Sequence, residues 1–247
     1  MSDPDEHVDQ RRAELARRLS VVRGRIAAAC VDAGRNPDEV TLVAVTKTYP
    51  SGDLRRLVDL GVHDLGENTD REAAAKATEL AAAELLVRWH FVGRLQRNKC
   101  RSVASYADLV HSVDNTPLVV ALDRAADQVR DHPLDVLVQV SLDGDLARGG
   151  AASDAAVPER DLERVIAAVA SASALRLRGL MAVAPLADDP ASAFGRVAEL
   201  AHAMRHDHPT ATILSAGMST DLEAAVAAGA THVRIGSALL GKRVLLG

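Results

Sequence analysis

The feature that most constrains this chain is a regular alternation of short apolar runs with helical patterns. Each run has the length and β-branched content of a buried strand, and the segments between runs carry apolar residues three and four positions apart. The runs cover residues 41–47, 62–65, 89–93, 108–113, 135–142, 177–184, 212–216 and 231–235. Eight strands alternating with helices predict an α/β fold, a (β/α)8 TIM-type barrel.

A doubly wound open sheet is the alternative α/β architecture. Such a sheet usually has fewer repeats, and a glycine-rich turn follows its first strand. Here the first run is followed by TYPSG at residues 48–52, which lacks that glycine pattern. The barrel is therefore the preferred fold.

Length and composition fit one domain. With 247 residues, of which 48% are hydrophobic, the chain is long enough for a sizeable core. Residues 1–10 are acidic and polar and are expected to form a flexible N-terminal tail, with a single barrel domain over residues 11–247. Leu19, Val22, Ile26 and Cys30 recur at helical spacing, which predicts an extra helix before the first strand.

A lysine ends the first strand-like run. Residues 41–47 read TLVAVTK, so Lys47 is expected at the carboxyl end of a buried strand, where barrel active sites gather. A lysine amine that loses hydration there has a lowered pKa and can attack a carbonyl group. The alternative is that Lys47 only caps the strand and extends into water.

The last two strands are followed by polar loops that suit a phosphate. SAGMST at residues 215–220 and RIGS at residues 234–237 bring backbone N–H groups, hydroxyls and glycines to one helix N-terminus. The alternative is that Ser219 and Thr220 only cap the following helix, for which Thr220 and Glu223 match a capping box.

A phosphate site and a strand-end lysine together suggest pyridoxal 5′-phosphate held as a Schiff base. Arg234 would then face the pyridine nitrogen, and because an arginine cannot give up a proton, the cofactor would be a weak electron sink. The alternative role for Arg234 is a buried ion pair with a carboxylate such as Glu67. An aldolase-type Schiff base on Lys47 without a cofactor is a further alternative.

Six motifs in the chain resemble, in order, those of the YggS/PROSC family, the pyridoxal phosphate homeostasis proteins. They are VAVTK (43–47), LGEN (65–68), WHFVGRLQRNK (89–99), HSVD (111–114), GLMAVAP (179–185) and LSAGMSTDLEAAVAAGATHVRIGSALLG (214–241). The resemblance implies a monomeric barrel similar to the N-terminal domain of alanine racemase. It implies cofactor-binding roles for the residues Lys47, Asn68, Ser215, Met218, Ser219, Arg234, Gly236 and Ser237.

In the implied site, Lys47 carries the cofactor and Asn68 lies beside its ring, while the serines, Met218 and Gly236 hold the phosphate. The chain departs from the family after the LGEN motif, and again at residues 142–158, which are rich in Gly, Ala and Ser. Arg148 stands where the family commonly has a lysine. This segment is expected to be a mobile loop over the barrel mouth.

The resemblance and the residues together predict a role in intracellular pyridoxal phosphate homeostasis, with possible transfer to apo-enzymes. Tyr49 and Tyr106 are the only tyrosines, and no second base for racemization is evident. No catalytic residue is therefore assigned, and a low-activity racemase or lyase that uses the same cofactor is the alternative function.

Composition excludes several partners. A net charge of −5 argues against nucleic-acid binding, and no apolar run approaches the roughly 20 residues of a membrane span. Cys30 and Cys100 form no CxxC pair, which favours a reduced, cytoplasmic protein. No metal site is expected, and His202, His206 and His208 are interpreted as a solvated helix end.

Overall fold

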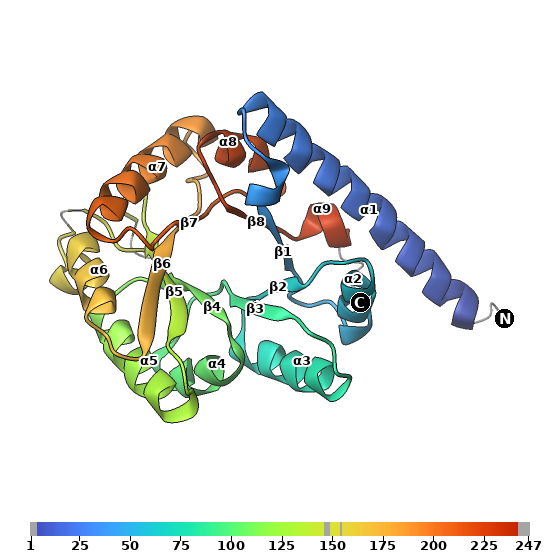
Figure 1. Cartoon of the computed structure of the whole chain (residues 1–247), viewed down its shortest axis with the longest axis horizontal. Coiled ribbons are helices and arrows are strands. Elements are labelled where there is room, and N and C mark those ends of the chain that lie inside the picture. The colour runs from blue at the N-terminus through green and yellow to red at the C-terminus, as the bar shows by residue number, and fades with distance from the viewer. Residues whose placement is uncertain (1–3, 146–148, 154, 242–247) are drawn as a thin grey trace.

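A computed structural model shows a closed barrel of eight parallel strands surrounded by helices (Figure 1). The structure describes residues 4–145, 149–153 and 155–241. The strands are β1 (Thr41–Val45), β2 (Asp64–Glu67), β3 (Arg88–Phe91), β4 (Leu109–Val113), β5 (Leu134–Val140), β6 (Leu175–Ala182), β7 (Ile213–Ser215) and β8 (His232–Ile235). They pair in chain order, and β1 pairs with β8 to close the barrel. The predicted (β/α)8 fold is confirmed.

The helices follow the strands around the outside of the barrel. They are α1 (Pro4–Asp32), α2 (Ser51–Asp59), α3 (Asp70–Ala82), α4 (Cys100–Tyr106), α5 (Thr116–Val129), α6 (Leu162–Ala170), α7 (Pro190–Asp207), α8 (Leu222–Ala227) and α9 (Ser237–Leu240). Side-chain caps mark the starts of some of them. Asn115 caps α5 by accepting the Leu118 N–H, and Asp189 caps α7 by accepting the Ser192 N–H.

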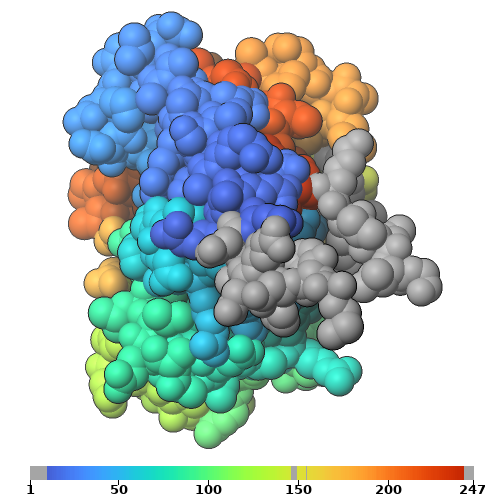
Figure 2. Space-filling view, turned by 90° about the vertical axis from the view of Figure 1, so that its right-hand side faces the viewer, coloured from blue at the N-terminus to red at the C-terminus, as the bar shows by residue number. Residues whose placement is uncertain are grey.

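The extra helix α1 lies across the outside of the barrel beside α2, α8 and α9 (Figures 1 and 2). Its side chains Leu19, Val22, Ile26 and Cys30 are buried, as the spacing predicts. α1 begins at Pro4, so residues 4–10 lie within this helix. Proline is tolerated in a first helical turn, and no glycine interrupts the helix before Gly24. Whether this segment is flexible stays a prediction.

Two apolar clusters fill the space between barrel and helices. One cluster is centred on β4, β5 and β6 with α5, α6 and α7, and the other joins α1 and α2 to β1 and β8. Within the described residues, no helix is both long and apolar enough to cross a bilayer. The same residues contain no group of three or more side chains placed to hold a metal ion.

Part of the segment after β5, which is expected to be a mobile loop over residues 142–158, packs against the end of that strand, and its mobility stays a prediction. Gly149 and Gly150 have positive φ angles, and a Cβ at Gly150 would lie 2.5 Å from the Ser141 nitrogen. Ala151 is fully buried and donates its N–H to the Gln139 carbonyl at 2.7 Å. The two glycines therefore let the chain return against the end of β5. Arg148 lies outside the described residues.

Candidate functional site

A pocket of about 480 Å3 opens at the carboxyl ends of the strands. The lining residues come from the ends of β1, β2, β3, β6 and β8 and from the loop after β7, and they are Val45, Lys47, Asn68, Val92, Met181, Val183, Met218, Ser219, Thr220, Arg234, Gly236 and Ser237. Seven of the eight predicted cofactor-binding residues are among them, and Ser215 is the exception. Segments distant in the sequence therefore meet at the mouth predicted for a barrel active site.

Lys47 lies two residues beyond the end of β1, in a turn, and it is exposed. The predicted strand extends to Lys47, whereas β1 ends two residues earlier. Because Lys47 is exposed, its amine is not desolvated by the protein itself. The residue before it is fixed instead: the Thr46 hydroxyl donates to Glu67 Oε1 at 2.7 Å. The side chain of Lys47 thus extends from an anchored backbone into the pocket mouth.

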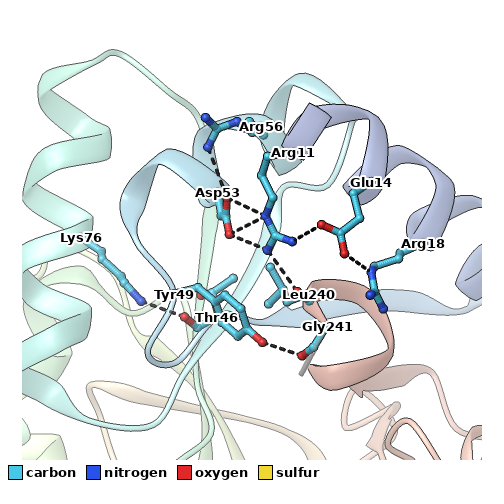
Figure 3. A network of polar contacts seen from close by, with 10 residues as sticks. All are labelled: Arg11, Glu14, Arg18, Thr46, Tyr49, Asp53, Arg56, Lys76, Leu240 and Gly241. Atoms are coloured by element: carbon cyan, nitrogen blue, oxygen red, sulfur yellow. Dashed lines mark hydrogen bonds and ion pairs between the residues drawn. The ribbon is translucent and has the colours of Figure 1, made fainter. Parts of the chain in front are cut away.

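A buried lysine of α3 holds both neighbours of Lys47. Lys76 Nζ donates to the Thr46 carbonyl at 2.8 Å and lies 2.7 Å from carboxylate oxygens of both Glu67 and Glu72. Glu72 in turn accepts the Thr48 N–H. Figure 3 shows Lys76 reaching from its helix to Thr46.

Thr48 has φ 71°, a left-handed conformation that is uncommon for a threonine. Such a conformation costs free energy and persists only where surrounding contacts determine it. The Glu67–Lys76–Glu72 group, which we call the lysine clamp, supplies those contacts on both sides of Lys47. Sequence reasoning missed this clamp because α3 and the turn after β1 meet only in the folded chain.

Glu67 is 1% exposed, and its burial raises the pKa of its carboxyl group, while hydrogen bonds from Lys76 and Thr46 offset part of the rise. Its Oε2 atom is buried and has no hydrogen-bond partner within the described part of the chain. The ion pair between Glu67 and Arg234, which was the alternative role for that arginine, does not form.

Arg234 lies in β8 and reaches the floor of the pocket with only 5% of its surface exposed. One terminal nitrogen, Nη1, donates to Ser215 Oγ at 2.6 Å, and Nη2 donates to the Ala182 carbonyl at 2.8 Å. Burial lowers the pKa of Arg234 to about 10, so the guanidinium stays charged at neutral pH. It can only donate hydrogen bonds to a group in the pocket.

Ser215, which is expected to hold the phosphate, lies below the pocket and is the one predicted residue outside its lining. The side chain is fully buried beneath the pocket and does not line it. Its hydroxyl accepts a hydrogen bond from Arg234 and lies 3.0 Å from His111 Nδ1. Because side chains alternate along β7, the serine that ends this strand points into the barrel, where it positions the arginine.

The loops after β7 and β8 form the side of the pocket that is expected to hold the phosphate, which we call the phosphate side. Ser237 Oγ and Ser219 Oγ lie 3.4 Å apart, and the Ala238 N–H donates to Ser219 Oγ at 3.3 Å. Ser219 therefore contacts the start of α9 and does not cap α8. The Thr220 and Glu223 capping box is also wrong, because α8 begins at Leu222 without a side-chain cap.

Both helices that begin here are short, with six residues in α8 and four in α9. A macrodipole contribution from so few peptide units is small. Hydroxyl groups and backbone N–H groups are consequently the main donors that this side offers to an anion. Gly217 has φ 89°, and a Cβ there would lie 2.6 Å from the Ala225 Cβ, so only glycine fits this loop.

Asn68 follows β2 and lines the pocket together with these loops. Its backbone lies directly against Gly93, where a Cβ would be 1.9 Å from the Asn68 carbonyl oxygen. The glycine of the VGRL segment therefore permits the close approach that places Asn68 at the pocket.

Tyr49 points away from the pocket. Its hydroxyl donates to the Gly241 carbonyl at 2.6 Å, next to Arg11, which pairs with Asp53 and donates to the Leu240 carbonyl (Figure 3). This phenol joins the turn after Lys47 to the end of α9 and does not approach the pocket as a base.

The comparisons with known proteins agree with this geometry. The family model for the alanine racemase N-terminal domain matches residues 26–244. A protein of Mycobacterium tuberculosis (strain ATCC 25618 / H37Rv) named pyridoxal phosphate homeostasis protein is 47% identical over 95% of both chains. The protein of that name from Escherichia coli (strain K12) is 38% identical over 93% of this chain and 97% of its own.

A solved structure extends the similarity to the fold. PipY of Synechococcus elongatus PCC7942, determined with PLP bound, superimposes with a TM-score of 0.77 at 33% identity and covers 92% of this chain and 100% of its own. Sequence, family model and fold thus point the same way. The chain belongs to the alanine racemase N-terminal domain family and, within it, to the pyridoxal phosphate homeostasis proteins.

Proposed function

We propose that this protein binds pyridoxal 5′-phosphate reversibly at Lys47 and serves its intracellular homeostasis. The observation that carries the proposal is the convergence, in one pocket, of an accessible primary amine, a buried arginine and a pair of loop hydroxyls. The pocket volume of about 480 Å3 lies within the roughly 300–1,000 Å3 range of small-molecule sites. The named relatives, one of them solved with PLP, support it.

Each pocket residue has a role that follows from its functional group. When bound, pyridoxal 5′-phosphate supplies an aldehyde that condenses reversibly with a primary amine. Lys47 provides that amine, and its exposure leaves it accessible for both loading and release. Ser219, Ser237 and the backbone around Gly236 offer donors to the phosphate.

Arg234 favours storage over turnover. A permanently protonated guanidinium can donate to the ring nitrogen but cannot protonate it, so the bound cofactor withdraws few electrons from an attached amino acid. The lysine clamp holds the backbone on both sides of Lys47, and therefore fixes where the amine enters the pocket.

The proposal includes release of the cofactor to apo-enzymes, a monomeric state and a cytoplasmic location. Cys30 and Cys100 are both buried free thiols, which fits a reducing compartment. The accessibility of Lys47 supports exchange with a recipient protein.

The test is the visible absorption spectrum of the purified protein with added cofactor, before and after borohydride. A yellow band that borohydride abolishes is expected, and Lys47→Ala should lack it. Lys99→Ala is the matched control, since Lys99 is an exposed lysine outside this pocket, and it should keep the band.

A protein that stays colourless with excess cofactor would contradict the proposal and favour the aldolase-type alternative. Exchange of the α-proton of an added amino acid, followed by NMR in deuterated water, would instead show catalysis. In that case the racemase or lyase alternative replaces storage.

A further inference from the structure

A line of hydrogen-bonded side chains crosses the interior of the barrel from the pocket to the opposite mouth. Arg234 Nη1 donates to Ser215 Oγ at 2.6 Å, and Ser215 Oγ lies 3.0 Å from His111 Nδ1. His111 Nε2 lies 2.9 Å from His90 Nδ1, and His90 Nε2 lies 2.9 Å from Asp64 Oδ1. Five strands contribute one residue each.

The two ends of this line determine the direction of every hydrogen bond. Arg234 can only donate, and an ionised Asp64 can only accept. Each hydrogen bond between these two ends contains one proton. The Ser215 hydroxyl, which accepts from Arg234, must therefore donate its own proton to His111 Nδ1. His111 then donates from Nε2 to His90, and His90 donates from Nε2 to Asp64. This arrangement gives both rings one defined neutral tautomer.

The charges around the line support this assignment. Burial alone raises the pKa of Asp64, but hydrogen bonds from His90 and Arg88 outweigh it and lower the pKa to about 2. Burial above all, with the nearby charge of Arg234, lowers the pKa of His111 well below its ordinary value. The carboxylate end is therefore ionised at neutral pH, and His111 is neutral.

The surroundings include other titratable groups. His232 of β8 lies near His90, with ring centroids 5.9 Å apart, and its own burial lowers its pKa to about 3. His232 Nδ1 contacts the Thr231 hydroxyl and takes no part in the line. Arg88 pairs with Asp64 from the rim of the barrel. Neither Arg88 nor His232 changes which atom donates in each hydrogen bond of the line.

A line of polar side chains is unusual in a barrel interior, which branched apolar side chains usually fill. Burying polar groups costs free energy unless each one is hydrogen-bonded, and here both nitrogens of both rings are. At its far end, Asp64 and Arg88 line a second pocket, of about 450 Å3, at the amino ends of the strands. The line thus joins two solvent-accessible mouths.

We propose that Asp64, His90, His111 and Ser215 form a polarised hydrogen-bond relay that positions the Arg234 guanidinium. Through this relay, a change in the hydrogen bonding of Asp64 at the far mouth alters how strongly the pocket holds the cofactor. The four are positioning residues. The role of Arg234 toward the cofactor rests on the proposed function, whereas the relay itself is a property of the chain without a ligand.

The first test uses cofactor-free protein and nitrogen-15 NMR of its histidine rings. His90 and His111 are expected in the neutral tautomer protonated at Nε2, and His111 should keep this form as the pH falls from 7 toward the onset of acid unfolding. Mixed tautomers, or a cationic His111 at pH 7, would overturn the relay. This result does not depend on whether the cofactor binds.

The second test asks whether the far end affects the pocket. Asp64→Asn replaces the fixed acceptor with an amide that also donates, so the second tautomer should become populated at both rings. Retention of pyridoxal 5′-phosphate should weaken roughly tenfold, the loss expected for one hydrogen bond to a charged group. His111→Gln should weaken it at least as much.

His232→Gln is the matched control, because it alters a half-buried ring that lies beside His90 but outside the line. It should leave cofactor retention and the tautomers of His90 and His111 unchanged. Equal losses in Asp64→Asn and His232→Gln would indicate a general packing effect and overturn the relay. An unchanged dissociation constant in Asp64→Asn would overturn it too, while leaving the proposed function intact.

Discussion

The two sides of the pocket are built in different ways. On the lysine side, the turn around Lys47 is held by a buried ion cluster in which Lys76 joins Glu67, Glu72 and the Thr46 carbonyl. On the phosphate side, no buried ion cluster of this kind holds the loops after β7 and β8 within the described residues. Hydrogen bonds to loop carbonyls hold them instead, from the Arg234 N–H to Gly217 and from Arg25 Nη1 to Ser219, each at 2.9 Å, together with glycine conformations.

The two sides therefore depend on different interactions to hold their backbone in place. Buried charges fix a backbone at the expense of desolvation, and removing one partner leaves another charge uncompensated. Loop hydroxyls and glycines depend on local backbone shape, and most of their polar groups stay near water. We therefore expect the largest losses of stability from changes on the lysine side, and smaller losses from changes on the phosphate side, where a hydroxyl can be removed with little effect on folding.

The largest expected effect is that of Lys76→Met. Removal of the ammonium leaves Glu67 buried without its ion pair, and the free energy of unfolding should fall by about 3–5 kcal/mol. Urea denaturation followed by circular dichroism measures the loss. The double variant with Glu67→Gln removes the stranded charge and should recover much of the stability. A loss in Lys76→Met below about 1 kcal/mol, the level of an exposed pair, would refute the lysine clamp.

An intermediate effect is expected for Gly217→Ala on the phosphate side. The new methyl group meets Ala225 and the backbone has φ 89°, so the free energy of unfolding should fall by about 1–3 kcal/mol and the cofactor should bind more weakly. Gly229→Ala is the control, since its φ is 95° but no atom lies within 4 Å of the new Cβ. If both variants bind the cofactor equally well, close packing of Gly217 does not shape this side.

The smallest effect on stability is expected for Ser219→Ala. Its hydroxyl makes only the two long contacts at the start of α9, so the free energy of unfolding should change by less than about 0.5 kcal/mol. Cofactor affinity, measured by titration of the visible band, should nevertheless fall roughly tenfold if the hydroxyl donates to the phosphate. A stability loss without any change in affinity would reverse the proposed division between the two sides.

The sequence predicted the phosphate side more fully than the lysine side. SAGMST and RIGS are contiguous motifs, and six of their residues line one pocket: Met218, Ser219, Thr220, Arg234, Gly236 and Ser237. Even there, Ser215 does not line the pocket, because a strand residue next to a loop points inward when its neighbour points outward. Lys76 was not found at all, since a lysine in a helix of ordinary composition gives no sign of burial.

The sequence by itself determined the number and order of strands, the barrel they close, and the residue types at its mouth. These follow from local periodicity and from chemistry carried by short motifs, and the predicted strands differ from the observed ones by no more than two residues at either end. Only the tertiary structure decided that Lys76 holds the Lys47 turn, that Arg234 pairs with Ser215 and not with Glu67, and that two histidines connect the pocket to Asp64. The physical reason is that such partners lie on different strands and helices, and their pairing depends on barrel closure and on the direction of each side chain within it.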